Sequence, residues 1–146
     1  MIRKFKKEDA AIYKKMVNEF YSSDAVCHPV DPQNIDNTIE ELLKSDTYAE
    51  CFMICNDDDT PVGYALLAKT FSQEAGGYVV WIEEIFITEE NRASGYGKEF
   101  FNFLEEYYSK TARFRIEVTD SNVIASKFYR KLGYEDLDYS QLVLDK

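Results

Sequence analysis

A short glycine-containing segment, Arg92-Ala-Ser-Gly-Tyr-Gly97, constrains this chain more than any other stretch. It follows an apolar run at 79–87 that predicts a β-strand, and it precedes residues 98–108, whose apolar positions recur with helical period. A turn between a strand and a helix leaves main-chain N–H groups unpaired at the positive end of the helix dipole, where a phosphate binds well. Glycine suits such a turn because it has no Cβ to obstruct a ligand or to disfavour a positive φ. The segment therefore predicts a phosphate-bearing ligand.

Two well-known phosphate loops do not match this segment. A P-loop needs glycines five residues apart followed by Lys and Ser or Thr, whereas these glycines are two apart and Lys98 is followed by Glu99. The dinucleotide fingerprint needs a third glycine three residues after Gly97, and that position is Phe100. Both nucleotide-binding classes are excluded on spacing.

Arg-x-x-Gly-x-Gly between a strand and a long helix instead resembles the loop by which GCN5-related N-acetyltransferases hold the pyrophosphate of acetyl-coenzyme A. The apolar-Glu-Glu-apolar-aromatic-apolar run before the loop fits the same family, as do Asn122, Phe128-Tyr129 and Leu132-Gly133-Tyr134 after it. The resemblance is firmest over residues 79–134. It implies a single N-acetyltransferase domain over residues 1–146, with acetyl-coenzyme A as cosubstrate.

Length and composition agree with one such domain. A chain of 146 residues can bury a sizeable core. No apolar stretch approaches the roughly 20 residues of a membrane span, and no signal peptide is visible. Three cysteines, an odd number in a short chain, argue against a disulfide framework and predict a reducing, cytoplasmic location.

Three features resemble metal ligands, but each has a simpler interpretation. Cys51 and Cys55 lie four residues apart on one face of an expected strand and are read as buried thiols. The aspartates at 57–59 lie between Asn56 and Pro61, which predicts a solvated hairpin turn. Since His28 is the only histidine, no metal site is expected.

The charge is strongly negative and unevenly distributed. The net charge is −10, and residues 21–60 contribute −9 from one base and ten acids. Nucleic-acid binding is therefore not expected, because Lys and Arg contacts to phosphates supply most of its affinity. The acidic segment favours a cationic ligand, although acidity of this kind mostly serves solubility.

Hydrophobic periodicity and turn residues predict eleven elements in the order β-α-α-β-β-β-α-β-α-β-β. This order predicts an α/β fold with a mixed, mostly antiparallel central sheet flanked by helices. The predicted elements, in chain order, are a strand at 2–6, helices at 8–21 and 34–44, strands at 48–56, 61–71 and 79–87, a helix at 98–108, a strand at 112–118, a helix at 121–132 and short strands near 134–139 and 141–144.

The resemblance assigns the cofactor contacts to two stretches of main chain. The strands at 79–87 and 112–118 would be parallel neighbours that splay apart around the cofactor. The pantetheine arm would pair with the backbone of Ile85, Phe86 and Ile87. The pyrophosphate would lie on the amides of Ala93, Ser94, Gly95, Tyr96, Gly97 and Lys98, with Arg92 adding charge. Asn122 matches a cofactor-contacting asparagine but also stands where a helix N-cap belongs, and both roles stay open.

Transfer of an acetyl group to an amine needs a base and an acid. An alkylammonium is neutral at pH 7 only at a cost of about 4–5 kcal/mol, so a positioned carboxylate that accepts its proton helps. Glu83 and Glu84 are adjacent on a strand and point to opposite faces unless a bulge intervenes. The family pattern favours Glu83, with Glu84 as the alternative. Tyr129 matches the tyrosine that protonates the departing thiolate, and we expect Ile124, Phe128 and Leu132 to form the packed face of its helix.

These residues lead to one principal hypothesis and two alternatives. The first is an acetyl-coenzyme A-dependent N-acetyltransferase for a primary amine, possibly a cationic small molecule such as a polyamine, in a protein that could form a homodimer as family members often do. The second is a non-catalytic acyl-coenzyme A-binding or regulatory module on the same fold. The third is an interaction protein in which the loop is only a turn. The resemblance also implies that the segment at 22–32 touches the acceptor.

Overall fold

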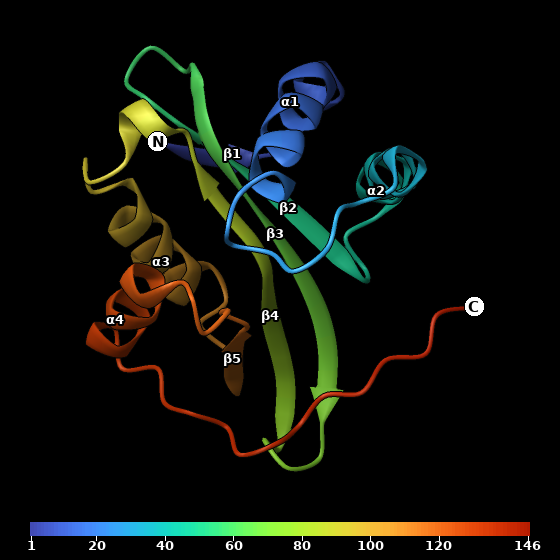
Figure 1. The fold of residues 1–146 in the computed structure, drawn as a ribbon, viewed down its shortest axis with the longest axis vertical. Coiled ribbons are helices and arrows are strands. Elements are labelled where there is room, and N and C mark those ends of the chain that lie inside the picture. The colour runs from blue at the N-terminus through green and yellow to red at the C-terminus, as the bar shows by residue number, and fades with distance from the viewer.

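The computed structural model describes all 146 residues and has an α/β architecture (Figure 1). The strands are β1 (Ile2–Lys4), β2 (Ala49–Cys55), β3 (Pro61–Ser72), β4 (Gly77–Ile87) and β5 (Arg113–Ile116). The helices are α1 (Ala10–Tyr21), α2 (Pro32–Lys44), α3 (Tyr96–Tyr107) and α4 (Val123–Lys131). Short 3-10 turns at Lys7–Asp9 and Glu89–Asn91 complete the set. No helix is both long and apolar enough to cross a membrane.

The five strands form one sheet in sequence order, β1 to β5. The pairs from β1 to β4 are antiparallel, and β4 pairs with β5 in parallel. The parallel pair arises because α3 carries the chain back along the sheet between these two strands. The mixed, mostly antiparallel sheet that the sequence predicts is confirmed.

Helices cover both faces of the sheet (Figure 1). Strand β2 shows why, since Cys51, Met53 and Cys55 belong to the core beneath α1 and α2 while Phe52 and Ile54 belong to the core beneath α3. A stretch of strand that is buried on both sides needs apolar residues at successive positions, which explains the continuous apolar run at 51–55. Helix α1 contributes Tyr13, Met16, Val17 and Phe20, and α3 contributes Phe100, Phe101 and Leu104.

A β-bulge at Glu83 interrupts the alternation of β4. Leu67 pairs with Ile82 and Leu66 with Glu84, so Glu83 is an extra residue without a partner on β3. Before the bulge the even-numbered Ile82 faces the α3 side, whereas after it the even-numbered Phe86 faces the α1 side. One inserted residue therefore exchanges the faces of the rest of the strand.

Strands β4 and β5 part immediately after this point. Their last pair is Ile82 with Ile116, where β5 ends, while β4 continues to Ile87. The edge of β4 that faces β5 is thus unpaired from the bulge onward. The splay that the resemblance implies is present.

The two strands predicted after α4 are absent, and that part of the prediction is wrong. No strand follows α4, and the tail runs across the far end of the sheet instead (Figure 1). Polar residues at 136, 138 and 140 alternate with Leu137 and Tyr139, but both of these side chains stay exposed, so a strand would bury little there. The side chains of Leu142, Val143 and Leu144 are 98%, 84% and 80% exposed. The main side-chain anchor is the hydroxyl of Tyr139, which donates to Glu74 at 3.0 Å.

Candidate active site

The loop that opens α3 presents a row of free main-chain donors. Helix α3 begins at Tyr96, and the first amides of a helix have no partner within it. None of the N–H groups of residues 93–98 donates a hydrogen bond inside the protein. Ala93 and Gly95 adopt φ of 62° and 89°, which turns the chain and leaves these donors pointing outward. This arrangement fits an anion with several oxygens, such as a diphosphate.

The two glycines of the loop have different roles. Gly95 needs its lack of a Cβ because of its positive φ, and nothing lies within 4 Å of the place where a Cβ would be. Gly97 has no positive φ, and a Cβ there would lie 3.6 Å from the ring of Phe128 in ordinary contact. The left-handed conformation of Ala93 was not foreseen, because alanine carries no signal for it.

Arg92 links this loop to the end of β4. Its Nε donates to the carbonyl oxygen of Ile87 at 3.1 Å, and its guanidinium lies 5.9 Å from the centroid of the Phe86 ring. The side chain is exposed and has no carboxylate partner. Its positive charge therefore stands between the free amides and the free edge of β4.

The edge of β4 offers the second stretch of unpaired main chain. Ile85, Phe86 and Ile87 bond to β3 on one side only, because β5 has already ended. Phe86 is buried toward α1, and Ile85 and Ile87 pack toward α3. The side chains fix the strand while its outer main-chain groups stay available to an extended ligand, apart from the carbonyl oxygen of Ile87, which accepts from Arg92.

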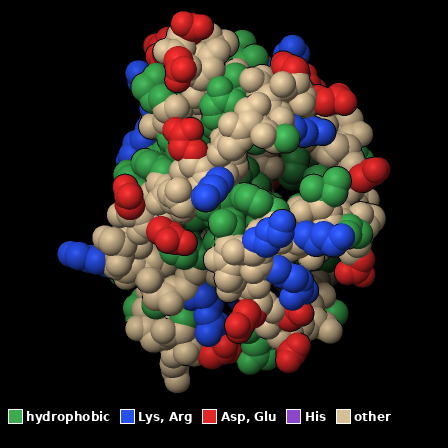
Figure 2. Space-filling view, turned by 90° about the vertical axis from the view of Figure 1, so that its left-hand side faces the viewer, with side chains coloured by type: hydrophobic (Ala, Val, Ile, Leu, Met, Phe, Trp, Pro, Cys, Tyr) green, Lys and Arg blue, Asp and Glu red, His purple; other side chains and the backbone are tan.

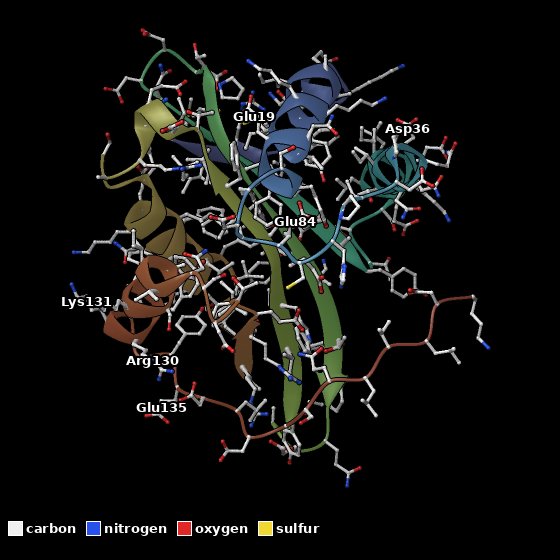
Figure 3. All side chains as sticks on the ribbon, in the orientation of Figure 1. Glu19, Asp36, Glu84, Arg130, Lys131 and Glu135 are labelled. Atoms are coloured by element: carbon white, nitrogen blue, oxygen red, sulfur yellow. The ribbon has the colours of Figure 1, made fainter.

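Glu84 is buried beneath α1 and is held by two tyrosines. The hydroxyl of Tyr21 donates to one carboxylate oxygen at 2.7 Å, and the hydroxyl of Tyr64 donates to the other at 2.6 Å. Burial raises the pKa of Glu84, although both hydrogen bonds act in the opposite direction. Figure 3 shows Glu84 between the sheet and the end of α1. Both oxygens are engaged within the protein, which leaves little freedom to accept a proton from a ligand.

Glu83 has the opposite environment. It lies at the bulge, its side chain reaches solvent, and it makes no hydrogen bond or ion pair. Partial desolvation raises its pKa, and the nearby carboxylates of Glu117 and Glu84 raise it further. Glu117 is the first residue beyond the last β4–β5 pair, so both carboxylates stand where the strands part. Of the two adjacent glutamates, Glu83 is the free one.

Tyr129 lies across the same opening on α4. Its ring packs against Phe101 and Tyr134, with centroids 5.7 and 6.2 Å apart. The hydroxyl makes no hydrogen bond within the protein, and burial raises its pKa to about 12. Tyr129 and Glu117 line one hollow of about 870 Å³ beside β5. The expected packed face of this helix is wrong at Ile124, which is 85% exposed because the helix begins at the edge of the core.

Helix α4 also carries Asn122 and a group of basic residues. The side chain of Asn122 accepts a hydrogen bond from the amide of Ala125 at 3.2 Å and caps α4, so its capping role is confirmed. Arg130 is paired with Asp136 at 2.7 Å, and Arg130 and Lys131 point away from the sheet (Figure 3). Figure 2 shows Lys and Arg side chains grouped near the middle of the face that carries α3 and α4.

The sequence did not single out every residue of this neighbourhood. Tyr21 and Tyr64 lie in a helix and a strand far from Glu84 in the chain, and only tertiary packing brings them together. Glu117 could have been found, since it stands in the predicted strand 112–118 that was expected to splay from the strand of Glu83. Three of the chain's carboxylates thus meet at this site. No group of three or more His, Cys, Asp or Glu side chains is arranged to hold a metal ion.

An α/β sheet that opens between two parallel strands, with free amides at the next helix, defines the acetyltransferase class of fold. The chain belongs to the acetyltransferase (GNAT) family, whose model matches residues 12–134. Members of this family use acetyl-coenzyme A.

A curated relative and two solved structures agree with this assignment. An uncharacterized N-acetyltransferase of Methanocaldococcus jannaschii is 32% identical over 92 residues, a match that covers 61% of this chain and 55% of the relative. The chain thus spans about half the length of that relative. A possible acetyltransferase from Clostridium difficile 630 superposes with a TM-score of 0.82 at 19% identity, covering 100% of this chain and 97% of the other. AAC(6')-Iy, in complex with the bisubstrate analog CoA-S-monomethyl-acetylneamine, gives 0.80 at 16% identity with the same coverage.

Proposed function

We propose that this protein is an N-acetyltransferase that transfers the acetyl group of acetyl-coenzyme A to a primary amine. The observation that carries the proposal is the set of free amides at residues 93–98, next to the unpaired edge of β4. These two surfaces fit the two ends of one ligand, a diphosphate and an extended amide-containing arm. Acetyl-coenzyme A would supply an activated thioester carbonyl at the opening between β4 and β5.

The protein's own residues would accept one proton from the amine and donate another to the departing thiolate. Glu83, free and with a raised pKa, accepts a proton from the amine as the amine attacks. A raised pKa makes the carboxylate a stronger base toward the amine. Glu117 adds a second negative charge that attracts an ammonium ion to the opening, at the expense of also stabilising the charged form.

Tyr129 is the proposed acid. With a pKa of about 12 its hydroxyl stays protonated at every pH at which the protein would work. It can give this proton to a departing thiolate and regain one from water. Its lack of a partner within the protein leaves the hydroxyl available for that contact.

Three narrower expectations stay predictions. A polycationic acceptor such as a polyamine follows from the acidic composition. A cytoplasmic location follows from three free cysteines. A homodimer follows from the resemblance alone.

The first experiment separates cofactor binding from transfer. Acetyl-coenzyme A should raise the melting temperature, because a ligand bound only by the folded state stabilises it by about 2.7 kcal/mol at a hundred times its Kd. A panel of primary amines that includes spermidine is then assayed for thiol release. Binding without thiol release for any amine would identify a non-catalytic acyl-coenzyme A module, and absence of binding would overturn the proposal altogether.

A further inference from the structure

The hollow beside β5 extends well beyond the two proton-transfer groups. It lies between the outer edge of β5, helix α4 and tail residues 134–141. Tyr129 and Glu117 line it at the opening, and Trp81 and Arg115 line it further along the sheet. Its volume of about 870 Å³ is larger than an ammonium group needs. The other lining residues would therefore contact the rest of the acceptor molecule.

Arg115 differs from the other arginines of this hollow. Arg113 forms an ion pair with Glu74 at 2.9 Å, and Arg130 forms one with Asp136 at 2.7 Å. Arg115 forms no ion pair and makes no hydrogen bond, and it acts on Glu74, the partner of Arg113, only at longer range. Its guanidinium instead lies 3.8 Å from the centroid of the Trp81 ring, and parallel pairing of these two residues places both side chains on one face.

A stacked guanidinium is well prepared to bind an oxyanion. The indole contacts only the flat face of the cation, so the N–H donors in its plane stay free. Stacking also restricts the side chain, which lowers the ordering cost of binding. The planar fork of donors matches a carboxylate in a bidentate manner.

The distance from Arg115 to the proposed proton-transfer groups sets the distance between the charged groups of a ligand that contacts both. Arg115 lies on β5 and Glu117 directly follows the end of that strand, so their Cα atoms are separated by two residues, roughly 7 Å if the backbone stays extended. On β4, Trp81 pairs with Arg115, and Glu83 follows at the bulge, where Glu117 is close enough to act on its charge. Arg115 and Glu117 are therefore groups of opposite charge that line the same hollow, and Glu83 lies close to Glu117.

We propose that the acceptor is a small zwitterion, whose primary amine lies at Glu83 and Glu117 and whose carboxylate binds Arg115. This inference rests on the proposed function and narrows its substrate class. A polyamine of similar length would place a second cation against the unpaired guanidinium of Arg115. The proposal therefore replaces the polyamine acceptor expected from composition, and the two acceptor classes predict opposite preferences.

The test uses a matched pair of acceptors, ε-aminocaproate and n-pentylamine, which differ by the carboxylate alone. We expect kcat/KM to be about 10- to 100-fold higher for ε-aminocaproate, as a hydrogen bond between charged groups would give. Arg115→Gln should abolish this preference, mainly through KM. Arg115→Lys should restore only part of it, because lysine keeps the charge but lacks the planar fork. The control Arg113→Gln, on the same strand and face, should keep it.

Three results would overturn the inference: no preference in the wild type, a preference for spermidine over ε-aminocaproate, or an equal loss for both acceptors in Arg115→Gln. Calorimetric titration of ε-aminocaproate into the coenzyme A-loaded protein gives a second readout. Binding that depends on Arg115, with no amine acetylated, would sustain the anion site and reject the transfer. Transfer to n-pentylamine without any contribution from Arg115 would support the acetyltransferase function and reject the anion site.

Discussion

The side chain of Glu83 has no hydrogen-bond or ion-pair partner because it lies at a one-residue bulge in β4. In a regular strand the two adjacent glutamates would simply face opposite sides of the sheet. The bulge instead leaves Glu84 beneath α1, bonded to Tyr21 and Tyr64, and leaves Glu83 unpartnered at the opening. The same residue type thus has a structural role at one position and a proposed chemical role at the next.

Replacing Glu83 by glutamine should remove the proposed base. We expect kcat to fall about 100-fold or more, with little change in affinity for coenzyme A. In the wild type kcat/KM should fall as the pH drops through the pKa of Glu83, which lies above the ordinary glutamate value, and this acid limb should vanish in the variant. Rates measured across pH check this. Glu90→Gln, an exposed glutamate after β4, is the control, and an unchanged acid limb in Glu83→Gln would assign the base elsewhere.

Replacing Tyr129 by phenylalanine should remove the proposed acid while keeping the packed ring. We expect about a 100-fold loss in kcat with KM for acetyl-coenzyme A nearly unchanged, measured by steady-state kinetics. Tyr134→Phe is the matched control, since that ring packs against Tyr129. A larger loss in Tyr134→Phe than in Tyr129→Phe would transfer the role to Tyr134.

At the scale of elements, the site depends on where helices and strands begin and end. Helix α3 starts at Tyr96 directly after two residues of positive φ, and β5 stops at Ile116 while β4 runs on to Ile87. The amides and the free edge are products of these two boundaries. Sequence periodicity located the elements well but gave β5 three residues too many, from 112 to 118 instead of Arg113–Ile116.

The loop before α3 can be tested with two equivalent glycines. Gly95→Ala forces alanine into a φ of 89° and should cost about 1–2 kcal/mol of stability. It should also displace the amides and weaken coenzyme A binding about 10-fold or more, as calorimetry would measure. Gly76→Ala, at a φ of 75° in the β3–β4 turn, has the same strain and equally open surroundings.

The control variant Gly76→Ala should lose a similar amount of stability but retain its affinity for coenzyme A. Equal affinity losses in both variants would mean that binding follows general stability. Unchanged affinity in Gly95→Ala would mean that the loop does not hold the ligand.

At the scale of the molecule, a buried ionic cluster joins four elements away from the site. Glu50 of β2 pairs with Lys4 of β1 at 2.7 Å and with Lys69 of β3 at 3.0 Å, and it accepts hydrogen bonds from Tyr107 and Tyr108 near the end of α3. Burial by itself would raise the pKa of Glu50, but these contacts outweigh it and lower the pKa to about 2.

A lowered pKa makes this cluster a source of acid-sensitive stability. The folded protein binds the proton more weakly than the unfolded chain, so the contribution is complete above pH 4.5 and disappears as the pH falls toward 2. Glu50→Gln should therefore lower the free energy of unfolding at pH 7 by about 2–3 kcal/mol and flatten the acid limb. Denaturant unfolding at several pH values measures both.

A partly exposed surface glutamate on α2 provides the control for Glu50. Glu41 lies 4.0 Å from Lys44 on α2, and Glu41→Gln should change stability by at most about 0.5 kcal/mol. If the loss of unfolding free energy in Glu50→Gln is the same at pH 7 and at low pH, Glu50 acts through packing and not through its charge.

The distribution of charge also becomes clear only at this scale. The acidic segment 21–60 suggested a cationic ligand, yet many of its carboxylates are used away from the opening. Asp36 pairs with Lys14, Asp46 with Lys4, and Asp59 with Arg3. The carboxylates beside the opening, Glu83, Glu84 and Glu117, lie outside that segment.

The sequence by itself determined the order of the first nine elements, the strand–loop–helix unit around Arg92–Gly97 and the residues Glu83 and Tyr129. These follow from local rules: periodicity, turn chemistry and a family motif within a short stretch of chain. Only the tertiary structure decided which glutamate is free, because the bulge depends on how β4 pairs with β3. It also brought Tyr21 and Tyr64 to Glu84 and left Arg115 on Trp81 without a carboxylate, since contacts between distant segments have no local signal. The tail remained outside the sheet for the same reason, because a strand forms only where pairing and burial outweigh its loss of conformational entropy.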